Sequence, residues 1–329
     1  MACIEKRKLG QAALALAFGG LAGRPARAQG GWPSRSVTMI VPWAPGGSND
    51  VVARLLSPGL QKAFGKSFVV ENRAGGGGAV GMGMAARARP DGHTLLISSA
   101  SNHVFNHFVV PDQGYDPREA LSAICMMVDV PNALAVHPSL GVSDVQGLLA
   151  KIRATPGGLS YASTGVGSSN HLAGELLRLR AGVELNHVPY RGGGPALADL
   201  ISGTIPVAFL NLPTVLPAVE AGQVRLLGIG GKSRIPSRPD IPTIGEQGVE
   251  GYEIQSWTGL FTPRGTPRPV IERVAAEVKG LLGDPTTRER LVESGSENIW
   301  AGPDETDAFV RAEFDRWGPI VKQAGVTNG

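Results

Sequence analysis

The sequence predicts an α/β protein in which strands and helices alternate along the chain. Short apolar runs typical of buried strands precede segments whose apolar residues repeat at helical spacing. The 46 glycines and 25 prolines fall between these segments instead of forming one tract. A chain of 329 residues is long enough for two domains. Such alternation is typical of parallel sheets flanked by helices.

The first 28 residues predict an export signal. Residues 6–8 are basic, residues 9–23 form a short apolar core, and residues 26–28 read Ala-Arg-Ala, the A-x-A form of a cleavage site. The apolar core is too short for a permanent membrane helix, and Cys3 precedes it, which argues against a lipoprotein. We expect a mature chain that begins near Gln29 and is soluble in the periplasm.

Removal of this signal changes the charge balance. The full chain has 31 Lys and Arg against 28 Asp and Glu, and the signal takes five bases and one acid, so 26 and 27 remain. A near-neutral chain without a basic run is not typical of nucleic-acid or membrane-surface binding. Cys125 is then the only cysteine, so no intramolecular disulfide can form.

The stretch VPWAPGGSND, residues 41–50, predicts a strand, a glycine turn and a helix start. A turn of this kind directs unpaired backbone N–H groups forward, and the helix dipole favours negative charge there. The stretch therefore predicts an anion site at the N-terminus of the helix over residues 48–64.

The remaining elements follow the same alternation, until a strand and helices end the chain. The expected strands span residues 67–72, 94–100, 159–163, 185–190, 207–211, 225–230 and 256–263. The expected helices span residues 79–88, 143–154, 169–179, 194–202 and 213–221. In the last helix, Val310, Phe314, Trp317 and Val321 share one face and predict a packing stripe.

Two further glycine turns repeat the geometry of the first. Residues 164–169 lie between a strand and a helix, and Gly192, Gly193 and Gly194 precede another helix. In open α/β sheets, ligands bind beyond the carboxyl ends of strands, where all three turns fall. If the first turn belongs to one domain and the others to a second, they can face one another across a cleft.

Two patterns leave enzymatic or metal-binding interpretations open. Residues 76–81 satisfy G-x-G-x-x-G, so an NAD-dependent oxidoreductase stays an alternative, although Asp91 lies too near to serve as the usual ribose-binding acid. His103 and His107 have i, i+4 spacing but no obvious third ligand, so we expect ordinary, partly exposed histidines. Cys125 lies in an apolar run and is expected to be a buried hydrophobe. No G-x-S-x-G motif is present.

A series of motifs in order resembles one known family. They are VPWAPGGSNDVVAR, VVENRAGGGGAVGMGMAARARPDGHTLL, YDP, PNALAVHPS, STGVGSSNHLAGELL, VPYRGGGPALADLISG, IPTIGEQG and GLFTPRGTP. Over essentially the whole mature chain, the sequence resembles the periplasmic solute-binding receptors of the tripartite tricarboxylate transporter family, the TctC-like or Bug proteins. It departs at Ala74, His93 and His107, where that family often has proline, tyrosine and proline.

The resemblance implies a two-domain Venus-flytrap fold of the periplasmic binding protein class, type II-like, with a mainly parallel sheet in each domain. Domain 1 is expected at about residues 30–130 plus 246–329, and domain 2 at about 131–245. In this family the glycine block at residues 76–81 is a structural connection within domain 1. The resemblance implies a binding protein and not an enzyme, with no cofactor and no metal.

The resemblance also implies a site for the carboxylate of a small organic acid, held mainly by backbone N–H groups and small hydroxyl side chains. Carried over position by position, the ligand-binding residues are Trp43, Gly46, Gly47, Ser48, Asp50, Ser99, Ser101, Thr164, Gly165, Ser168, Ser169, Arg191 and Gly192. Because like charges repel, Asp50 is expected to organise its loop or to bind a polar end of the ligand.

The implied partners are the membrane permease subunits of a tripartite tricarboxylate-type transporter, and the protein is expected to be a monomer. A receptor that signals to a sensor kinase would share the same fold and stays an alternative. Dicarboxylates, amino acids and aromatic carboxylates are all compatible with a backbone-based grip on a carboxylate.

Overall fold

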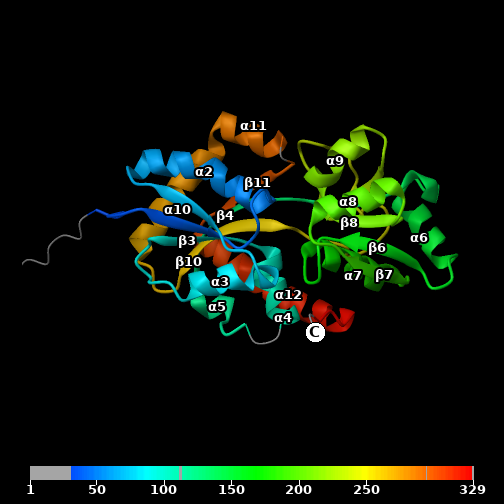
Figure 1. The fold of residues 1–329 in the computed structure, drawn as a ribbon, viewed down its shortest axis with the longest axis horizontal. Helices are drawn as coiled ribbons and strands as arrows, with labels where there is room; N and C mark the ends of the chain where they lie inside the picture. Colours follow the sequence, from blue (N-terminus) through cyan, green and yellow to red (C-terminus); the bar gives the residue numbers. More distant parts are fainter. Residues whose placement is uncertain (1–30, 111–112, 294, 328–329) are drawn as a thin grey trace, which may run out of the picture. The chain divides into compact units, whose positions relative to one another are not determined.

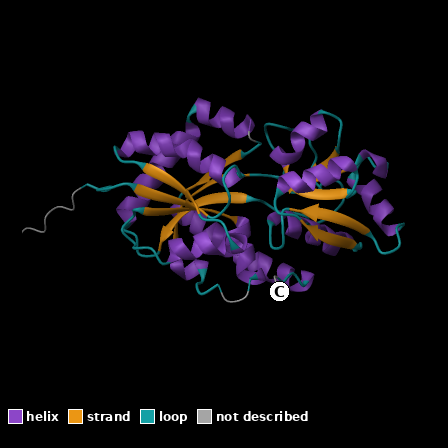
Figure 2. Cartoon of the chain, in the orientation of Figure 1, coloured by secondary structure: helices purple, strands orange, loops and turns teal. Residues whose placement is uncertain are grey.

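The computed structural model describes residues 31–110, 113–293 and 295–327, and the predicted export signal lies outside them. Two sheets account for its strands (Figures 1 and 2). Both sheets belong to one unit, Arg35–Gly329. The α/β fold class is therefore as predicted.

The first sheet has six strands in the order β11-β4-β10-β3-β1-β2. These strands are β1 (Val37–Val41), β2 (Phe68–Asn72), β3 (Thr94–Ser99), β4 (Leu121–Asp129), β10 (Trp257–Pro263) and β11 (Glu297–Ala301). Helices α2 (Ser48–Phe64) and α10 (Arg268–Gly283) cover one face, and α3 (Ala79–Ala86) and α12 (Pro303–Ala324) cover the other (Figure 1). The other helices of this part are α4 (Asn106–Val109), α5 (Pro117–Ala120) and α11 (Pro285–Glu293), with a 3-10 turn at Gly76–Gly78 and a π-helical turn at Ser101–Phe105.

The second sheet has five strands in the order β7-β6-β8-β5-β9. These are β5 (Asn132–Val136), β6 (Leu159–Ser163), β7 (Leu185–Pro189), β8 (Val207–Asn211) and β9 (Arg225–Ile229). Helices α8 (Gly193–Ser202) and α9 (Leu212–Glu220) pack together on one face, and α6 (Val145–Arg153) and α7 (Ser169–Ala181) lie on the other (Figure 1). A 3-10 turn at Pro138–Leu140 follows β5.

Both sheets are mixed, but most strands of each sheet run in one direction, as expected of mainly parallel sheets. In the first, β1 pairs in parallel with β2 and β3, whereas β10 and β11 pair antiparallel with their neighbours. In the second, β6 is parallel to β7 and β8, whereas β5 is antiparallel to β8 and β9. The reversed strands include β5 and β10, with which the chain enters each sheet from the other, and such strands need no helical crossover.

Two chain segments connect the sheets. Only Val130 and Pro131 separate β4 from β5, and residues 230–256 lead from β9 to β10. The Val130 N–H group donates to the Ser256 carbonyl at 3.3 Å, so the two segments run side by side. Strands β1 to β4, β10 and β11 lie in one sheet and β5 to β9 in the other, whereas the division into domains stays a prediction.

Helix α2 illustrates how local sequence fixes an element. Val52, Leu56 and Leu60 recur every four residues and are fully buried against the six-stranded sheet. Gly65 ends the helix with a left-handed conformation (φ 64°), and its N–H group donates to the Gln61 carbonyl. The helix begins at Ser48, as the sequence predicts.

The predicted stripe on the last helix is confirmed. Val310, Phe314, Trp317 and Val321 are all buried in the main hydrophobic core. The indole N–H groups of Trp317 and Trp257 both donate to the Glu313 carboxylate, at 3.2 and 3.3 Å. This shared acceptor satisfies two buried donors where α12 meets β10.

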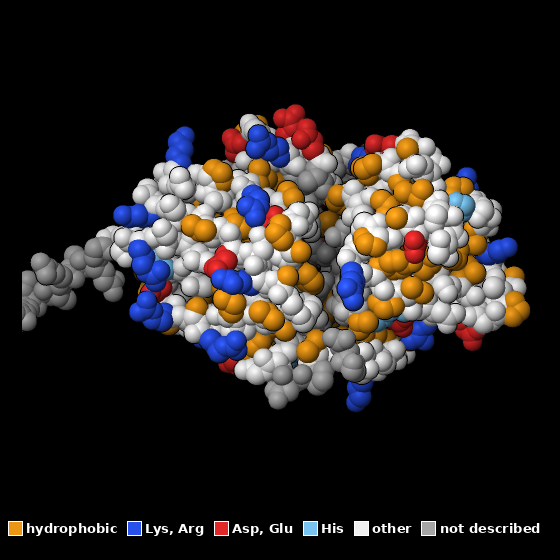
Figure 3. All heavy atoms as spheres, viewed as in Figure 1, with side chains coloured by type: hydrophobic (Ala, Val, Ile, Leu, Met, Phe, Trp, Pro, Cys, Tyr) orange, Lys and Arg blue, Asp and Glu red, His pale blue; other side chains and the backbone are white. Residues whose placement is uncertain are grey.

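Among the described residues, no helix combines the length and the apolar character that crossing a membrane requires. On the face drawn in Figure 3, the Lys and Arg side chains are scattered among acidic and uncharged ones. Cys125 is buried, and burial raises the pKa of its thiol, as expected of a packing residue.

Candidate functional site

The first predicted loop joins β1 to α2. Gly46 has a left-handed conformation (φ 86°), which strongly favours glycine, whereas Gly47 is extended and forms the N-cap of the helix. Gly46 and Gly47 are exposed, and Ser48 is half-buried. The first backbone N–H groups of α2 have no partner within the helix by its geometry, so this loop has the features of an anion site.

Asp50 holds this loop in place. Its carboxylate accepts hydrogen bonds from Gly46 N–H (2.9 Å), Arg54 Nε (2.9 Å) and Asn72 Nδ2 (3.0 Å), and the side chain is almost fully buried. Burial acts to raise the pKa of Asp50, but the hydrogen bonds from Arg54, Gly46 and Asn72 outweigh it and lower that pKa. Asp50 is thus a charged carboxylate, and the hydrogen bonds that it accepts hold the turn in place. Trp43 is half-buried, and its carbonyl accepts from Asn72 Nδ2 at 3.0 Å.

The second predicted loop joins β6 to α7. Its turn contains Gly165 (φ 129°) and Gly167 (φ 75°). The Ser168 side chain caps α7: its Oγ accepts from His171 N–H at 3.1 Å and donates to the Gly165 carbonyl at 2.7 Å. The Ser168 hydroxyl therefore stabilises the start of α7. The resemblance implies that the same hydroxyl binds the ligand.

The structure brings the second loop against the end of β3. The Ser169 N–H group, the first of α7, donates to Ser101 Oγ at 3.0 Å, and Ser169 Oγ hydrogen-bonds to Ser256 Oγ at 3.2 Å. All three serines are buried. Predicted site residues 68 positions apart in the chain are thereby in direct contact. Ser99, in contrast, donates its hydroxyl to Asn102 Oδ1 at 2.9 Å.

The third predicted loop contains Arg191 and Gly192 and leads into α8. Arg191 is exposed, and Gly192 has a positive φ (110°) and forms the N-cap. A Cβ atom at the next residue, Gly193, would lie 2.9 Å from Thr214 Cγ2, so this turn packs closely on α9. The loop lies at the carboxyl end of β7, next to β6 and its loop.

Sequence reasoning missed a cluster of asparagines beneath the second loop. Asn170 Nδ2 donates to Asn132 Oδ1 (2.6 Å) and to Asn211 Oδ1 (3.2 Å), while its Oδ1 accepts from Thr164 Oγ1 (2.8 Å). The hydroxyl proton of Thr164 is therefore engaged within the protein. Asn132 and Asn211 oppose each other across β5 and β8. Asn211 ends a predicted strand, at the same sheet edge as the loops. This position is the sequence feature that could have indicated the asparagine cluster.

The glycine block at residues 76–81 is tightly packed. A Cβ at Gly78 would lie 2.9 Å from Asn102 Cβ, and one at Gly81 would lie 2.8 Å from the Arg73 carbonyl. Asn106 Nδ2 donates to the Gly77 carbonyl at 2.5 Å. These contacts are those of a structural connection, as the resemblance implies.

The expectation that His103 is partly exposed is wrong, although His107 is half-buried. His103 is buried with its ring centroid 4.1 Å from that of Phe261, and its Nδ1 lies 3.1 Å from Ser98 Oγ. Burial lowers the pKa of His103 to about 3, so it is neutral at physiological pH. The i, i+4 spacing alone did not predict the burial of His103. This burial arises because the π-helical turn and α4 pack against α12. In the described chain, no three His, Cys, Asp or Glu side chains are grouped to hold a metal.

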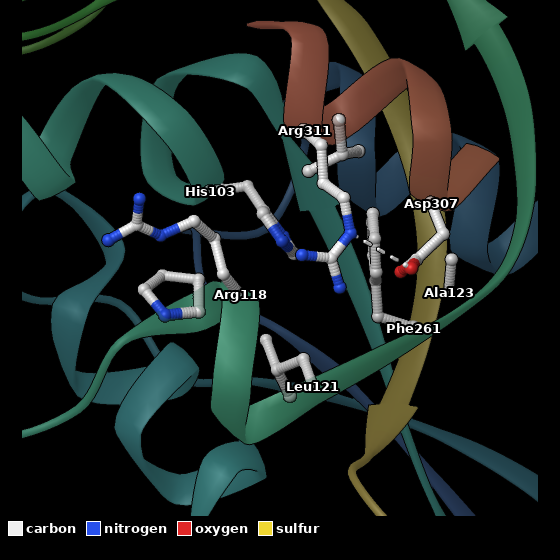
Figure 4. Close-up of a pocket in the computed structure, with 9 residues that line it drawn as sticks. His103, Arg118, Leu121, Ala123, Phe261, Asp307 and Arg311 are labelled. Atoms are coloured by element: carbon white, nitrogen blue, oxygen red, sulfur yellow. Dashed lines mark hydrogen bonds and ion pairs between the residues drawn. The ribbon is translucent and has the colours of Figure 1, made fainter. Parts of the chain in front are cut away.

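A small cavity of about 10 Å³ lies beside His103 (Figure 4). Arg118, Asp307 and Arg311 also line it, and Arg311 Nε lies 3.4 Å from Asp307 Oδ2. This volume holds about one water molecule. None of the predicted ligand-binding residues lines this cavity.

Both the sequence and the fold of this chain match known proteins. Residues 52–326 match the family model described as the tripartite tricarboxylate transporter family receptor, TctC. The chain belongs to this family. The family consists of solute-binding receptors of the periplasm and not of enzymes, which excludes the NAD-dependent alternative.

Individual relatives cover nearly the whole chain. Protein BugT of Bordetella pertussis is 35% identical over 295 residues, covering 89% of this chain and 90% of the relative. A structure of R. palustris Rpa4515 with adipate is 37% identical with a TM-score of 0.82, covering 90% of this chain and 99% of that one. MatC of Rhodopseudomonas palustris with bound malate is 31% identical with a TM-score of 0.78, covering 88% and 100%. The periplasmic binding protein fold is thus confirmed.

Proposed function

We propose that this receptor binds a small carboxylate-bearing metabolite between the loop at residues 46–48 and the loops at residues 164–169 and 191–192. The Ser101–Ser169 hydrogen bond carries the proposal, because it joins the carboxyl end of β3 to the N-terminus of α7. Helices α2 and α7, of 17 and 13 residues, begin at the first and second loops, and both termini favour an anion. The structures of Rpa4515 with adipate and MatC with malate support a carboxylate ligand.

The expected affinity follows from the hydrogen bonds that these loops offer. A carboxylate gains roughly 1.5 to 3 kcal/mol from each charge-assisted hydrogen bond. A favourable helix terminus adds up to about 2 kcal/mol. After the cost of association, a micromolar Kd, about −8 kcal/mol, is within reach without an arginine clamp.

The biological setting is proposed on the same basis. Residues 1–28 would direct export, and the mature monomer would deliver its ligand in the periplasm to the permease subunits of a tripartite tricarboxylate-type transporter. The expected domains, at about residues 30–130 plus 246–329 and at 131–245, would close on the ligand. A sensor kinase as the receiving partner stays an alternative.

Mass spectrometry of small molecules released by denaturing the natively purified protein tests the ligand class. We expect an organic acid at close to one equivalent per chain. Release of a nucleotide, a cation or an uncharged sugar would contradict the proposal.

A further inference from the structure

Two histidines stack on each other beside the second loop. His171 lies in the first turn of α7, and His187 lies on β7. Their ring centroids are 3.6 Å apart, and the ring planes are 9° from parallel. His171 is buried and His187 is half-buried. Because α7 packs on β7, the pair lies next to the turn that leads into this helix.

His171 binds one glycine of this turn directly. The Gly167 N–H group donates to His171 Nδ1 at 3.2 Å. Nδ1 therefore carries no proton, and the ring is neutral with its proton on Nε2. On its other side, Gly167 packs closely on α4, since a Cβ atom there would lie 3.1 Å from Asn106 Oδ1. The turn is thus held between His171 and α4.

His187 holds the other glycine of the turn through Ser163. His187 Nε2 lies 2.6 Å from Ser163 Oγ, which accepts from the Gly165 N–H group at 3.1 Å. The Ser163 hydroxyl has one proton to donate, and the Gly165 carbonyl lies farther from it, at 3.2 Å, than His187 does. Gly165 and Gly167 both have a positive φ, where glycine is free to adopt many conformations. Each histidine therefore restrains one flexible position of the turn.

Both rings are uncharged at neutral pH. Burial lowers the pKa of His171 to about 4. Burial, together with the neighbouring His171, lowers the pKa of His187 to about 3, although Glu175 acts to raise it. A proton on His171 Nδ1 would face the Gly167 N–H group, donor against donor, and two charged rings in stacking contact would repel each other.

Glu175 is the acid that acts on the pair, and it is already paired itself. Its carboxylate accepts from Tyr161 OH at 2.9 Å and from Arg178 Nε at 2.7 Å. Tyr161 faces His187 from β6, and Tyr252 packs on α7 from the second connecting segment, where its OH donates to the Ala173 carbonyl. Burial raises the pKa of both tyrosines, so neither supplies a negative charge to the rings.

We propose that His171 and His187 are positioning residues of the ligand site: as a neutral stacked pair, they hold Gly165 and Gly167 in the conformation that receives the anion. This inference rests on the proposed function, in which the second loop binds a carboxylate. The ligand binds only the fraction of molecules whose turn has this conformation, so a looser turn raises the Kd in proportion. The histidines thus promote anion binding without contact to the ligand and without a positive charge.

Nitrogen-15 NMR of the imidazole nitrogens in the mature protein tests the state of the pair without any ligand. We expect His171 to carry its proton on Nε2 alone at pH 7, and both rings to stay neutral down to pH 5. A cationic ring at pH 6, or a proton on His171 Nδ1 at pH 7, would overturn the inference.

Two substitutions at His171 separate positioning from packing. In His171→Asn, the side-chain oxygen can replace Nδ1 as the acceptor for Gly167, whereas His171→Phe keeps a ring for stacking but has no acceptor. Calorimetric titration at pH 7 uses adipate and malate as probes. We expect the Kd to rise at least about 10-fold in His171→Phe and to stay within about threefold of wild type in His171→Asn. Equal affinities of the two variants would overturn the inference.

The pH dependence of binding distinguishes positioning from attraction by charge. A double variant, His171→Asn with His187→Gln, cannot be protonated at either position, so the ratio of the wild-type Kd to its Kd cancels the titration of the acid itself. This ratio should be constant from pH 7 to pH 5 and should rise below pH 4, where the pair begins to protonate. A ratio that falls in acid would mean that charged rings attract the anion, which contradicts the inference.

His137→Ala is the matched control. His137 Nδ1 accepts from the Ser139 N–H group at 3.3 Å, a bond of the same type, but it follows β5 at the sheet edge opposite to the ligand loops. Its loss should leave the Kd for both acids unchanged. If His171→Phe does not fold, the NMR and the pH profile decide. Failure of both acids to bind the wild type would count against the proposed function, whereas a protonated His171 Nδ1 would overturn this inference alone.

Discussion

Asp50 decides the shape of the loop between β1 and α2. Its buried carboxylate ties Gly46, Arg54 and Asn72 together, and its pKa is lowered because these hydrogen bonds outweigh burial. Asp50→Asn should lower the free energy of unfolding at pH 7 by about 1 to 3 kcal/mol. Because the pKa of Asp50 is lowered in the folded state, its carboxylate stabilises the fold above the unfolded pKa of 3.8. The loss of stability in Asp50→Asn should therefore shrink as the pH falls below 3.8.

Asp307→Asn is the control for this prediction. Asp307 also pairs with an arginine four residues later, Arg311, but it lies at the surface, where such pairs contribute little. Urea unfolding at pH 7 and pH 3 measures both variants. Equal losses for Asp50→Asn and Asp307→Asn would show that the buried network does not hold the loop.

The residues of the first loop were largely predictable because their contacts are local. Asp50 lies four residues from both Gly46 and Arg54, and the strand, turn and helix follow one another. The need for glycine at Gly46 and not at Gly47 was not predictable, since it depends on φ. The asparagine cluster was not predictable either, because its bonds join residues 38 and 41 positions apart.

Strand β4 ends in a buried acid at the first connection between the sheets. Asp129 is buried, and its Oδ1 has no partner among the described residues. Burial, together with the nearby Glu297 and Glu313 carboxylates, raises the pKa of Asp129 to about 7, although the backbone N–H groups of Ser256 and Val130 act to lower it. The folded state therefore prefers the protonated acid.

Asp129→Asn should accordingly stabilise the protein at high pH. A raised pKa means that wild-type stability is greatest below the unfolded value of 3.8 and falls as the pH rises to about 7. The amide cannot ionise, so the variant should gain up to about 4 kcal/mol at pH 8 and little at pH 4. Urea unfolding at both pH values checks this, and a variant that is less stable than wild type at pH 8 would contradict it.

The helices and most strands were predictable from periodicity, but strand direction was not. Strands β5 and β10 show the same apolar pattern whichever way they run, so only the pairing reveals that they are antiparallel. The burial of His103 was similarly hidden, because it depends on Phe261 and Phe314, which are distant in sequence.

At the scale of the whole molecule, we expect ligand binding to draw the two predicted domains together. The Ser101–Ser169 hydrogen bond is one of the contacts between elements of the two sheets. Saturation with the released acid should lower the radius of gyration measured by small-angle scattering, because a ligand held by both sides favours the closed state. An unchanged radius would contradict closure. The fold was predictable at this scale from the order of motifs, whereas the domain boundaries stay a prediction.

The central claim is that the loops hold a carboxylate. Calorimetric titration with the acid released from the native protein, and with its methyl esters, tests this directly. Esterification removes the charge and adds bulk where backbone N–H groups converge. Esterifying the carboxylate that the loops hold should therefore raise the Kd at least about 10- to 100-fold, equivalent to 1.4 to 3 kcal/mol. Esters that all bind as tightly as the free acid would contradict the claim.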